Sequence, residues 1–185
     1  MSRRQTLRHD KTKLPRIWLM TDPRFGDDLL PAIKRLPFRS GVIFRHYELA
    51  EDARLALFRQ VKRICRQRGH ILLMAGDGRT TRRLRADGFH ARSGRRLSEK
   101  LVRSAPVHNQ RELAEAKRNK ADLVLISPVF ATASHLGAAV LGRNGLMRLA
   151  KLARGMKVIA LGGMNARNAA TLNVHGWAAI DAFRR

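Results

Sequence analysis

The sequence predicts an α/β fold in which short strands alternate with helices and close into a compact (β/α)8 TIM barrel. Three observations support this prediction. Short apolar runs recur along the chain, separated by segments with the apolar spacing of helices. The 185 residues are 44% hydrophobic and carry no linker-like tract, which favours a single core. Alternating strands and helices form a parallel sheet, and eight such units close into a barrel with its ligand loops after the strands.

The predicted strands are runs rich in Val, Ile, Leu, Met and Phe. Both faces of a barrel strand are buried, so such runs are nearly continuous rather than alternating. The eight runs are residues 16–21, 41–47, 70–75, 88–91, 102–107, 123–127, 157–161 and 178–182.

The predicted helices are short, and the clearest N-terminal signal is Asn109, which has Glu112 three residues later. Residues 92–101 leave room only for an abbreviated or missing helix. An open doubly wound sheet is the alternative fold, disfavoured as a dinucleotide site because no early G-x-G-x-x-G occurs. The helical segments are residues 27–36, 50–68, 79–85, 110–119, 144–154 and 166–173.

We expect a basic tail over residues 1–15 and a single barrel domain over residues 16–185. No apolar run is long enough to span a membrane, and the basic start of the chain is not followed by the apolar core of a secretory signal. These features favour a cytoplasmic protein. The single Cys65 has no partner for an internal disulfide and no metal-ligand companions nearby.

The charge balance is strongly basic: 38 Lys and Arg residues against 14 Asp and Glu residues give a net charge of +24. Such a field attracts polyphosphates, nucleic acids and acidic partners. The basic residues are scattered along the chain, and aromatic residues make up only 5% of it, so no stacking platform for single strands is evident. We therefore expect nucleic acid to bind only non-specifically, and a nucleic-acid-associated role is the remote alternative.

The stretch Val158 to Asn165 ends an apolar run in Gly162 and Gly163 and leads into a helical pattern. Glycines without Cβ atoms let a ligand approach backbone N–H groups, and a helix N-terminus favours an anion. A phosphate site is therefore one interpretation. The other is that the two glycines merely turn the chain.

A series of short motifs along the chain resembles the thiamine phosphate synthase and TenI family. The motifs run in order from Trp18-Leu19-Met20-Thr21-Asp22 through Ala86-Asp87-Gly88-Phe89-His90, Val107-His108-Asn109 with Glu112-Leu113-Ala114-Glu115-Ala116, Ala121-Asp122-Leu123-Val124 and Ser127-Pro128-Val129-Phe130-Ala131-Thr132-Ala133-Ser134-His135 to Ala160-Leu161-Gly162-Gly163-Met164-Asn165.

The resemblance implies a (β/α)8 barrel that joins a hydroxymethylpyrimidine pyrophosphate to a thiazole phosphate and releases pyrophosphate with Mg²⁺. Related barrels often form homo-oligomers, so the resemblance also implies a homo-oligomer as one possible state of this chain. By the resemblance, Gly162 and Gly163 hold the thiazole-side phosphate together with the turn at Ile180 and Asp181. Hydroxyls can cradle phosphate oxygens without transferring a proton, and Thr132 and Ser134 match the two hydroxyl positions that help to hold pyrophosphate.

Several positions depart from the family pattern. The family motif resembling Q-L-R-E-K corresponds to residues 45–49, which keep the Glu and lose the Lys. The family's N-D pair, whose Asp is expected to bind Mg²⁺, falls on Ala75-Gly76, with Asp77 one position late. No acidic residue lies between Gly88 and Ser98. The Lys expected after the hydroxyl loop is His135. Mg²⁺ prefers carboxylate oxygens, so Asp77 is only a weak candidate ligand and Mg²⁺ dependence is uncertain.

Two explanations remain open. Guanidinium groups can clamp pyrophosphate in place of Mg²⁺ and Lys, with Arg45 the foremost candidate and Arg79, Arg92 and Arg143 as others. Together with His135, and with His108 as a proton-transfer group, Arg45 forms the candidate catalytic set. Alternatively, the chain is a divergent barrel that binds a phosphorylated pyrimidine or thiazole without forming thiamine phosphate. The tautomerase activity of the TenI branch is not expected, because its His corresponds to Pro128.

Overall fold

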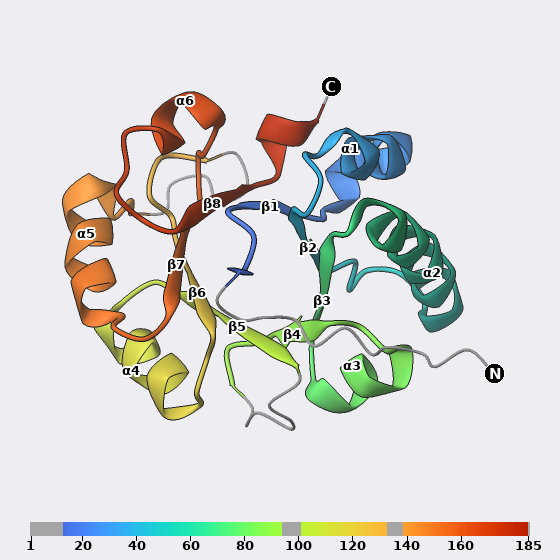
Figure 1. Cartoon of the computed structure of the whole chain (residues 1–185), viewed down its shortest axis with the longest axis horizontal. Coiled ribbons are helices and arrows are strands. Elements are labelled where there is room, and N and C mark those ends of the chain that lie inside the picture. The colour runs from blue at the N-terminus through green and yellow to red at the C-terminus, as the bar shows by residue number, and fades with distance from the viewer. Residues whose placement is uncertain (1–12, 94–100, 133–138, 185) are drawn as a thin grey trace.

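The computed structural model describes residues 13–93, 101–132 and 139–184. Eight parallel strands form a closed barrel in chain order, and pairing of the first strand with the last completes the closure (Figure 1). The predicted (β/α)8 barrel is therefore confirmed. The strands are β1 (Ile17–Met20), β2 (Gly41–Phe44), β3 (Ile71–Ala75), β4 (Gly88–His90), β5 (Val102–Val107), β6 (Leu123–Ile126), β7 (Lys157–Ala160) and β8 (Gly176–Ala179).

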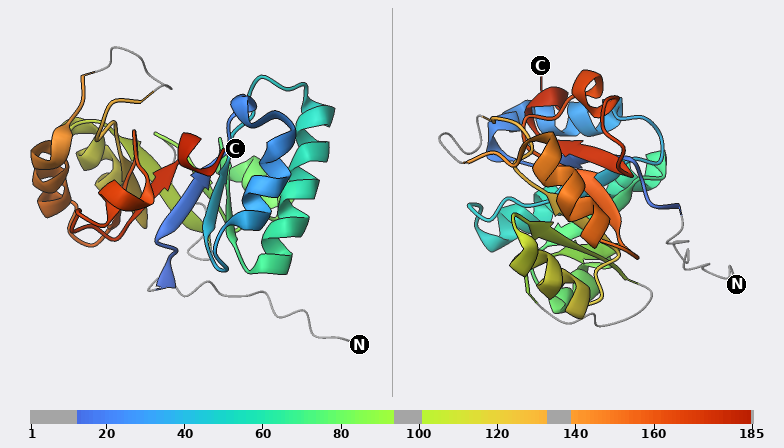
Figure 2. Two further views of the ribbon diagram at one scale, coloured as in Figure 1. Left: turned by 90° about the horizontal axis from the view of Figure 1, so that it is seen from above. Right: turned by 90° about the vertical axis from the view of Figure 1, so that its left-hand side faces the viewer.

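Helices surround the barrel, with α2 and α1 packed on one flank and α4 and α5 on the other (Figure 2). None of the described helices is long and apolar enough to cross a membrane. The helices are α1 (Leu29–Arg35), α2 (Glu51–Arg68), α3 (Gly78–Leu84), α4 (Gln110–Arg118), α5 (Gly142–Leu152) and α6 (Ala166–Ala169), with 3-10 turns η2 (Pro23–Asp28) and η4 (Asp181–Phe183).

The barrel interior is filled by side chains that alternate along each strand. Trp18 is fully buried and lies in register with Gly41 on the neighbouring strand. A Cβ at Gly41 would come within 2.1 Å of the Trp18 ring, so this glycine makes room for the indole. The indole N–H donates to the carbonyl of Pro15 at 2.8 Å. Trp18 therefore packs the centre of the barrel while Met20, two residues later on the same side of β1, lines the pocket described below.

Asp87 and Asp122 each precede a strand and act as structural residues. The Asp87 carboxylate accepts the backbone N–H of Leu72 at 2.8 Å, and the Asp122 carboxylate accepts that of Arg103 at 2.8 Å. Each carboxylate thus ties its turn to an adjacent strand, as expected for an aspartate in a turn rather than in a reaction.

Two predicted elements were misplaced. The last strand is β8, Gly176–Ala179, and not residues 178–182, because the strand pairs at Gly176 and Trp177 with β7 and then gives way to η4. The helix expected over residues 166–173 ends at Ala169. Asn165 and Asn168 bond to each other's backbone N–H groups across this single turn.

The second strand, expected over residues 41–47, ends at Phe44, and His46 beyond it has a φ of +49°. Other boundaries differ less. The first helix begins at Leu29 rather than residue 27, because Gly26 interrupts the preceding turn with a φ of +49°. Asn109 caps α4 as predicted, accepting the N–H of Glu112 at 2.9 Å. No helix occurs in residues 91–93 or at residue 101, and residues 94–100 lie outside the described part of the chain.

Candidate active site

A pocket of about 650 Å³ opens at the carboxyl ends of the strands. This is the end of a parallel barrel at which ligand sites are found. Its wall is largely apolar, with a few polar groups from the loops after β2, β5, β6, β7 and β8. The lining residues are Met20, Arg45, His108, Ser127, Pro128, Thr132, Leu161, Gly162, Gly163, Met164, Asn165, Ala179, Ile180, Asp181 and Ala182.

The turn at Gly162 and Gly163 requires glycine at both positions. Their φ angles are +94° and +60°, and a Cβ would meet Pro128 Cα at 2.7 Å from Gly162 and Ala131 O at 2.4 Å from Gly163. The chain-turn interpretation is therefore correct as far as it goes, since both glycines allow the β6 loop to pack against the β7 loop.

The same turn also presents unused donors. The carbonyl of Gly162 accepts from Phe130 N at 3.1 Å and that of Gly163 accepts from Asn168 Nδ2 at 2.8 Å. Within the described residues, the two glycine N–H groups donate to nothing, and both glycines line the pocket. Because α6 has only four residues, its dipole adds little, and the turn offers an anion its own amides rather than a helix terminus.

His108 is held in one tautomer at the end of β5. Its Nδ1 lies 2.7 Å from the carbonyl oxygen of Ser127, which can only accept, so Nδ1 carries the proton. Its backbone N–H donates to Glu112 Oε2 at 2.8 Å. This tautomer leaves the lone pair on Nε2, the nitrogen that can accept a proton from a ligand in the pocket.

Arg45 enters the pocket from the end of β2. Its backbone N–H donates to the hydroxyl of Thr21, a fully buried residue, at 2.9 Å. Its Nη1 lies 3.4 Å from the Met20 sulfur, a weak acceptor. Arg45 thus brings a guanidinium with most of its hydrogen-bonding capacity available to the pocket.

Asp181 lies on the rim after β8, the strand that pairs with β1, and forms ion pairs with two arginines. Its Oδ1 accepts from Arg24 Nη1 at 3.0 Å and from Arg184 Nη1 at 3.1 Å. Arg24 also donates from Nε to Asp22 Oδ1 at 2.7 Å, linking the loops after β1 and β8. Burial raises the pKa of Asp22, but the hydrogen bonds and charge of Arg24 outweigh it, so that pKa is lowered overall.

Asp77, the weak candidate for a metal ligand, instead caps α3. Its Oδ1 accepts the N–H groups of Arg79 and Thr80 at 2.7 and 2.9 Å, and its Oδ2 accepts the Thr80 hydroxyl at 3.0 Å. These bonds, with the Thr80 N–H first, lower the pKa of Asp77 despite its partial desolvation. The carboxylate is committed to the helix and does not line the pocket.

The donor set therefore does not fit Mg²⁺. No group of three His, Cys, Asp or Glu side chains that suits a metal occurs in residues 13–93, 101–132 and 139–184. Asp181 is the carboxylate that lines the pocket, and one of its oxygens is shared by two guanidinium groups. A hard cation needs carboxylate oxygens that are not already neutralised.

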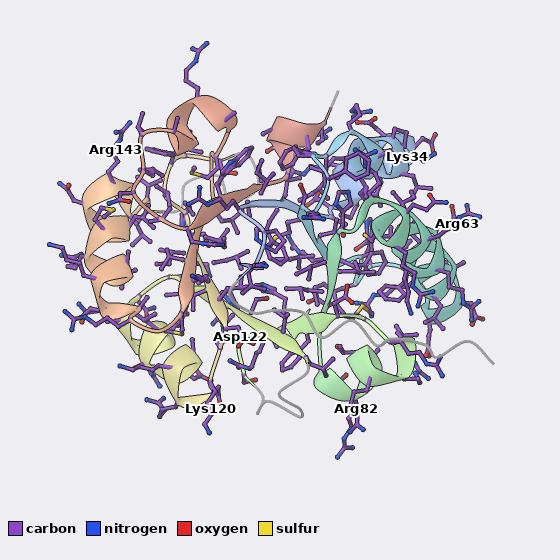
Figure 3. The ribbon with its side chains drawn as sticks, in the orientation of Figure 1. Lys34, Arg63, Arg82, Lys120, Asp122 and Arg143 are labelled. Carbon is purple, nitrogen blue, oxygen red and sulfur yellow. The ribbon has the colours of Figure 1, made fainter. Side chains whose placement is uncertain are left out.

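The structure brings most of the predicted residues to one pocket, although their roles stay predictions. Arg45, His108, Thr132, Gly162, Gly163, Ile180 and Asp181 all line it. Ser134 and His135 lie outside the described residues. Of the other candidate cations, Arg79 and Arg143 are exposed and do not line the pocket, and Arg92 pairs with Glu112 at 3.4 Å. Figure 3 shows Arg143 at the periphery of the barrel.

Sequence reasoning missed the apolar lining, chiefly Met20, Leu161 and Met164. Each continues or directly follows an apolar strand, so nothing in the sequence distinguishes it from the core. The alternation of side chains along a strand is the signal that separates Met20 and Leu161 from their buried neighbours, but it is usable only when the register is known.

A sequence profile of the family described as thiamine monophosphate synthase matches residues 38–183. This chain belongs to that family. Among curated members, the thiamine-phosphate synthase of Geobacillus kaustophilus (strain HTA426) is 30% identical over 125 residues, which cover 63% of this chain and 57% of that protein. That of Lysinibacillus sphaericus (strain C3-41) is 32% identical over 120 residues, covering 60% and 56%. The matched segments thus span little more than half the length of these relatives.

Solved structures in and beyond the family share the barrel. Thiamine phosphate pyrophosphorylase from Pyrococcus furiosus superposes with a TM-score of 0.76 at 21% identity, over 93% of this chain and 88% of that one. The 2-keto-3-deoxy-6-phospho-gluconate aldolase from Zymomonas mobilis ATCC 29191 superposes with a TM-score of 0.61 at 12% identity, over 91% and 83%. Barrels with different names share this architecture, so the fold does not choose the reaction.

Proposed function

We propose that the chain is a thiamine phosphate synthase-like transferase of thiamine biosynthesis. It would join a hydroxymethylpyrimidine pyrophosphate to a thiazole phosphate and release pyrophosphate. The observation that supports this proposal most strongly is the Gly162–Gly163 turn, which offers its N–H groups to an anion on the rim of the pocket. Family membership and the names of the relatives point to the same reaction.

The pocket residues suggest a division of labour. We propose that Gly162 and Gly163 hold the thiazole-side phosphate, with Ile180 and Asp181 closing the same side of the pocket. Arg45 and Thr132, with Ser134 and His135 from the neighbouring loop, would meet the pyrophosphate. His108, whose tautomer is set by Ser127, would present Nε2 to the ligand as a hydrogen-bond acceptor. The thiazole nitrogen attacks the pyrimidine cation with its lone pair, so the new C–N bond releases no proton.

Departure of pyrophosphate leaves a pyrimidine cation and concentrates negative charge on the leaving group. Stabilising that charge by fixed donors is the main task of such a site. The resemblance to the family implies Mg²⁺ in this task, but the carboxylates present here do not fit the ion. We therefore assign no step to a metal.

The test is product formation by the purified chain. With both substrates supplied, thiamine phosphate and pyrophosphate are expected in equal amounts, measured by chromatography and a coupled phosphate assay. Omission of either substrate is the control. A protein that binds thiazole phosphate but forms no thiamine phosphate with any divalent cation would contradict the proposal.

A binding function without synthase chemistry is the second candidate. It is favoured by one observation: the described part of the chain has no group of three His, Cys, Asp or Glu side chains that could hold a metal. In that case one phosphorylated thiazole or pyrimidine would bind without turnover. We also expect the chain to act in the cytoplasm and to self-associate as related barrels do.

A further inference from the structure

We infer that the β2–β3 side of the pocket binds a diphosphate group directly through Arg45, without Mg²⁺, and that Arg54 positions this arginine. The inference rests on the proposed function for the identity of the diphosphate ligand. It concerns which groups neutralise the charge of that ligand, a point that neither family membership nor the relatives' names address.

Arg54 of α2 bridges the ends of two neighbouring strands. Its Nε donates to the carbonyl of Arg45 at 3.1 Å, and its Nη2 donates to the carbonyl of Ala75, the last residue of β3, at 3.1 Å. The Phe44 and Tyr47 rings lie beneath its guanidinium, with centroids 5.8 and 5.2 Å from Cζ. The backbone of Arg45 is thus held by Thr21 on one side and by Arg54 on the other.

This bridge occupies the edge at which an acidic metal site would be needed. The residues after β3 are Gly76 and Asp77, and the Asp77 carboxylate points into the cap of α3. The nearby Glu48 carboxylate is bonded to His46 Nδ1 at 2.8 Å and is 44% exposed. A guanidinium therefore joins the strand ends, and no group of three His, Cys, Asp or Glu side chains that could hold a metal occurs in the described residues.

The guanidinium groups of Arg45 and Arg54 place positive charge at the ends of β2 and β3, which repels a divalent cation and attracts an anion. His90, next to β3, lies within the field of these groups. Its pKa is lowered to about 4, chiefly by burial and in addition by the charges of Arg45 and Arg103. Because this imidazole stays neutral, the excess positive charge near the pocket belongs to guanidinium groups.

Arg45 has the chemistry for a diphosphate. A guanidinium presents paired N–H groups that match two phosphate oxygens, and it remains charged at any relevant pH. The contact of Nη1 with Met20 sulfur at 3.4 Å is weak and easily exchanged for a phosphate oxygen. Since a bond to a charged group contributes about 1.5–3 kcal/mol, losing it should weaken binding about 10- to 100-fold.

The experiment is calorimetric titration of the full chain with inorganic pyrophosphate, with added Mg²⁺ or with EDTA. The dissociation constant is expected to be the same within about twofold in both conditions. Arg45→Ala should weaken it about 10- to 100-fold, and Arg45→Lys should recover part of the loss. Arg63→Ala, which removes an exposed arginine on the outer face of α2, is the matched control and should change nothing (Figure 3).

Arg54→Lys tests the positioning role. A lysine keeps the charge but cannot reach both carbonyls in one plane, so pyrophosphate binding should weaken several-fold while thiazole phosphate binding and the thermal midpoint stay near the wild-type values. A lowered midpoint with unchanged pyrophosphate affinity would mean that Arg54 is only structural.

Binding of pyrophosphate that appears only with Mg²⁺, or that survives Arg45→Ala, would overturn the inference. If Arg45→Ala does not fold, the wild-type titrations and Arg45→Lys still decide. The proposed function and this inference can fail separately. Mg²⁺-independent pyrophosphate binding without thiamine phosphate formation would contradict the proposed function but support the arginine site. Product formation with strictly Mg²⁺-dependent pyrophosphate binding would support the proposed function but contradict the arginine site.

Discussion

Replacing Gly163 by Ala separates the two reasons for a glycine at this turn. The φ of Gly163 is +60°, and that of Gly142 is +62°, so both substitutions force a left-handed conformation on a residue with a side chain. This costs about 1–2 kcal/mol of stability at either position. Only at Gly163 does the new Cβ also meet a backbone atom, Ala131 O at 2.4 Å, while nothing lies within 4 Å at Gly142.

The extra cost at Gly163 follows from that contact. The β6 loop must retreat by about 1 Å to restore an ordinary van der Waals distance. Displacing a packed backbone segment adds about 1–3 kcal/mol. We therefore expect Gly142→Ala to lose about 1–2 kcal/mol and Gly163→Ala about 2–5 kcal/mol of the free energy of unfolding.

Urea denaturation followed by tryptophan fluorescence measures both losses, and titration with thiazole phosphate measures the site. Gly163→Ala should weaken phosphate binding at least tenfold, because the loop shift disturbs the amides of the turn, whereas Gly142→Ala should leave it unchanged. Equal losses of stability in the two variants, with phosphate affinity retained in both, would refute the reasoning.

Three further predictions concern single side chains. The pKa of His90 is lowered to about 4, chiefly by burial, so the folded state binds a proton there less readily than the unfolded state does. The resulting stabilisation, about 3 kcal/mol, is fully present above about pH 6.5 and is lost as the pH falls from 6.5 to 4. His90→Gln should flatten that part of the curve of stability against pH. Burial raises the pKa of Cys65 to about 12, so a thiol reagent at pH 8 should label it only after denaturation, and rapid labelling of the native chain would disprove this. Asp181→Asn removes a negative charge beside the phosphate site and should raise the affinity for thiazole phosphate several-fold. The stability change should stay under about 1 kcal/mol, because the ion pairs of Asp181 are partly exposed. Weaker binding would show that Asp181 instead organises the site.

Most of the barrel could be predicted from the sequence because a strand that is buried on both faces consists of a nearly continuous run of apolar residues. β5 was placed to the residue, and β1, β3 and β7 to within one residue at each end. β8 was misplaced because its first residue is a glycine, chosen for space rather than for strand propensity. A Cβ at Gly176 would come within 2.1 Å of the carbonyl oxygen of Arg16, a contact that only the folded barrel reveals.

The sequence likewise identifies some residues of the candidate site and not others. Arg45 and His108 were identifiable because Arg45 lies near the end of a predicted strand and His108 directly follows one, and strand ends meet at one face of a barrel. Arg54 was not, because in the sequence it is one of many arginines on a long helix. Its role depends on the distance from α2 to two carbonyl oxygens, a tertiary property with no local signal. Asp77 was proposed as a weak metal candidate for its position, but the N–H groups at the start of α3 claim its carboxylate first.

The measurement that tests the central claim most directly is a titration of ¹⁵N-labelled protein with thiazole phosphate, followed by the amide resonances of the glycines. If the turn after β7 holds the phosphate, the Gly162 and Gly163 amide protons should move downfield and saturate together, while that of Gly155, which also has a positive φ but lies away from the pocket, should not move. Saturable binding that leaves the Gly162 and Gly163 amides unshifted would contradict the claim.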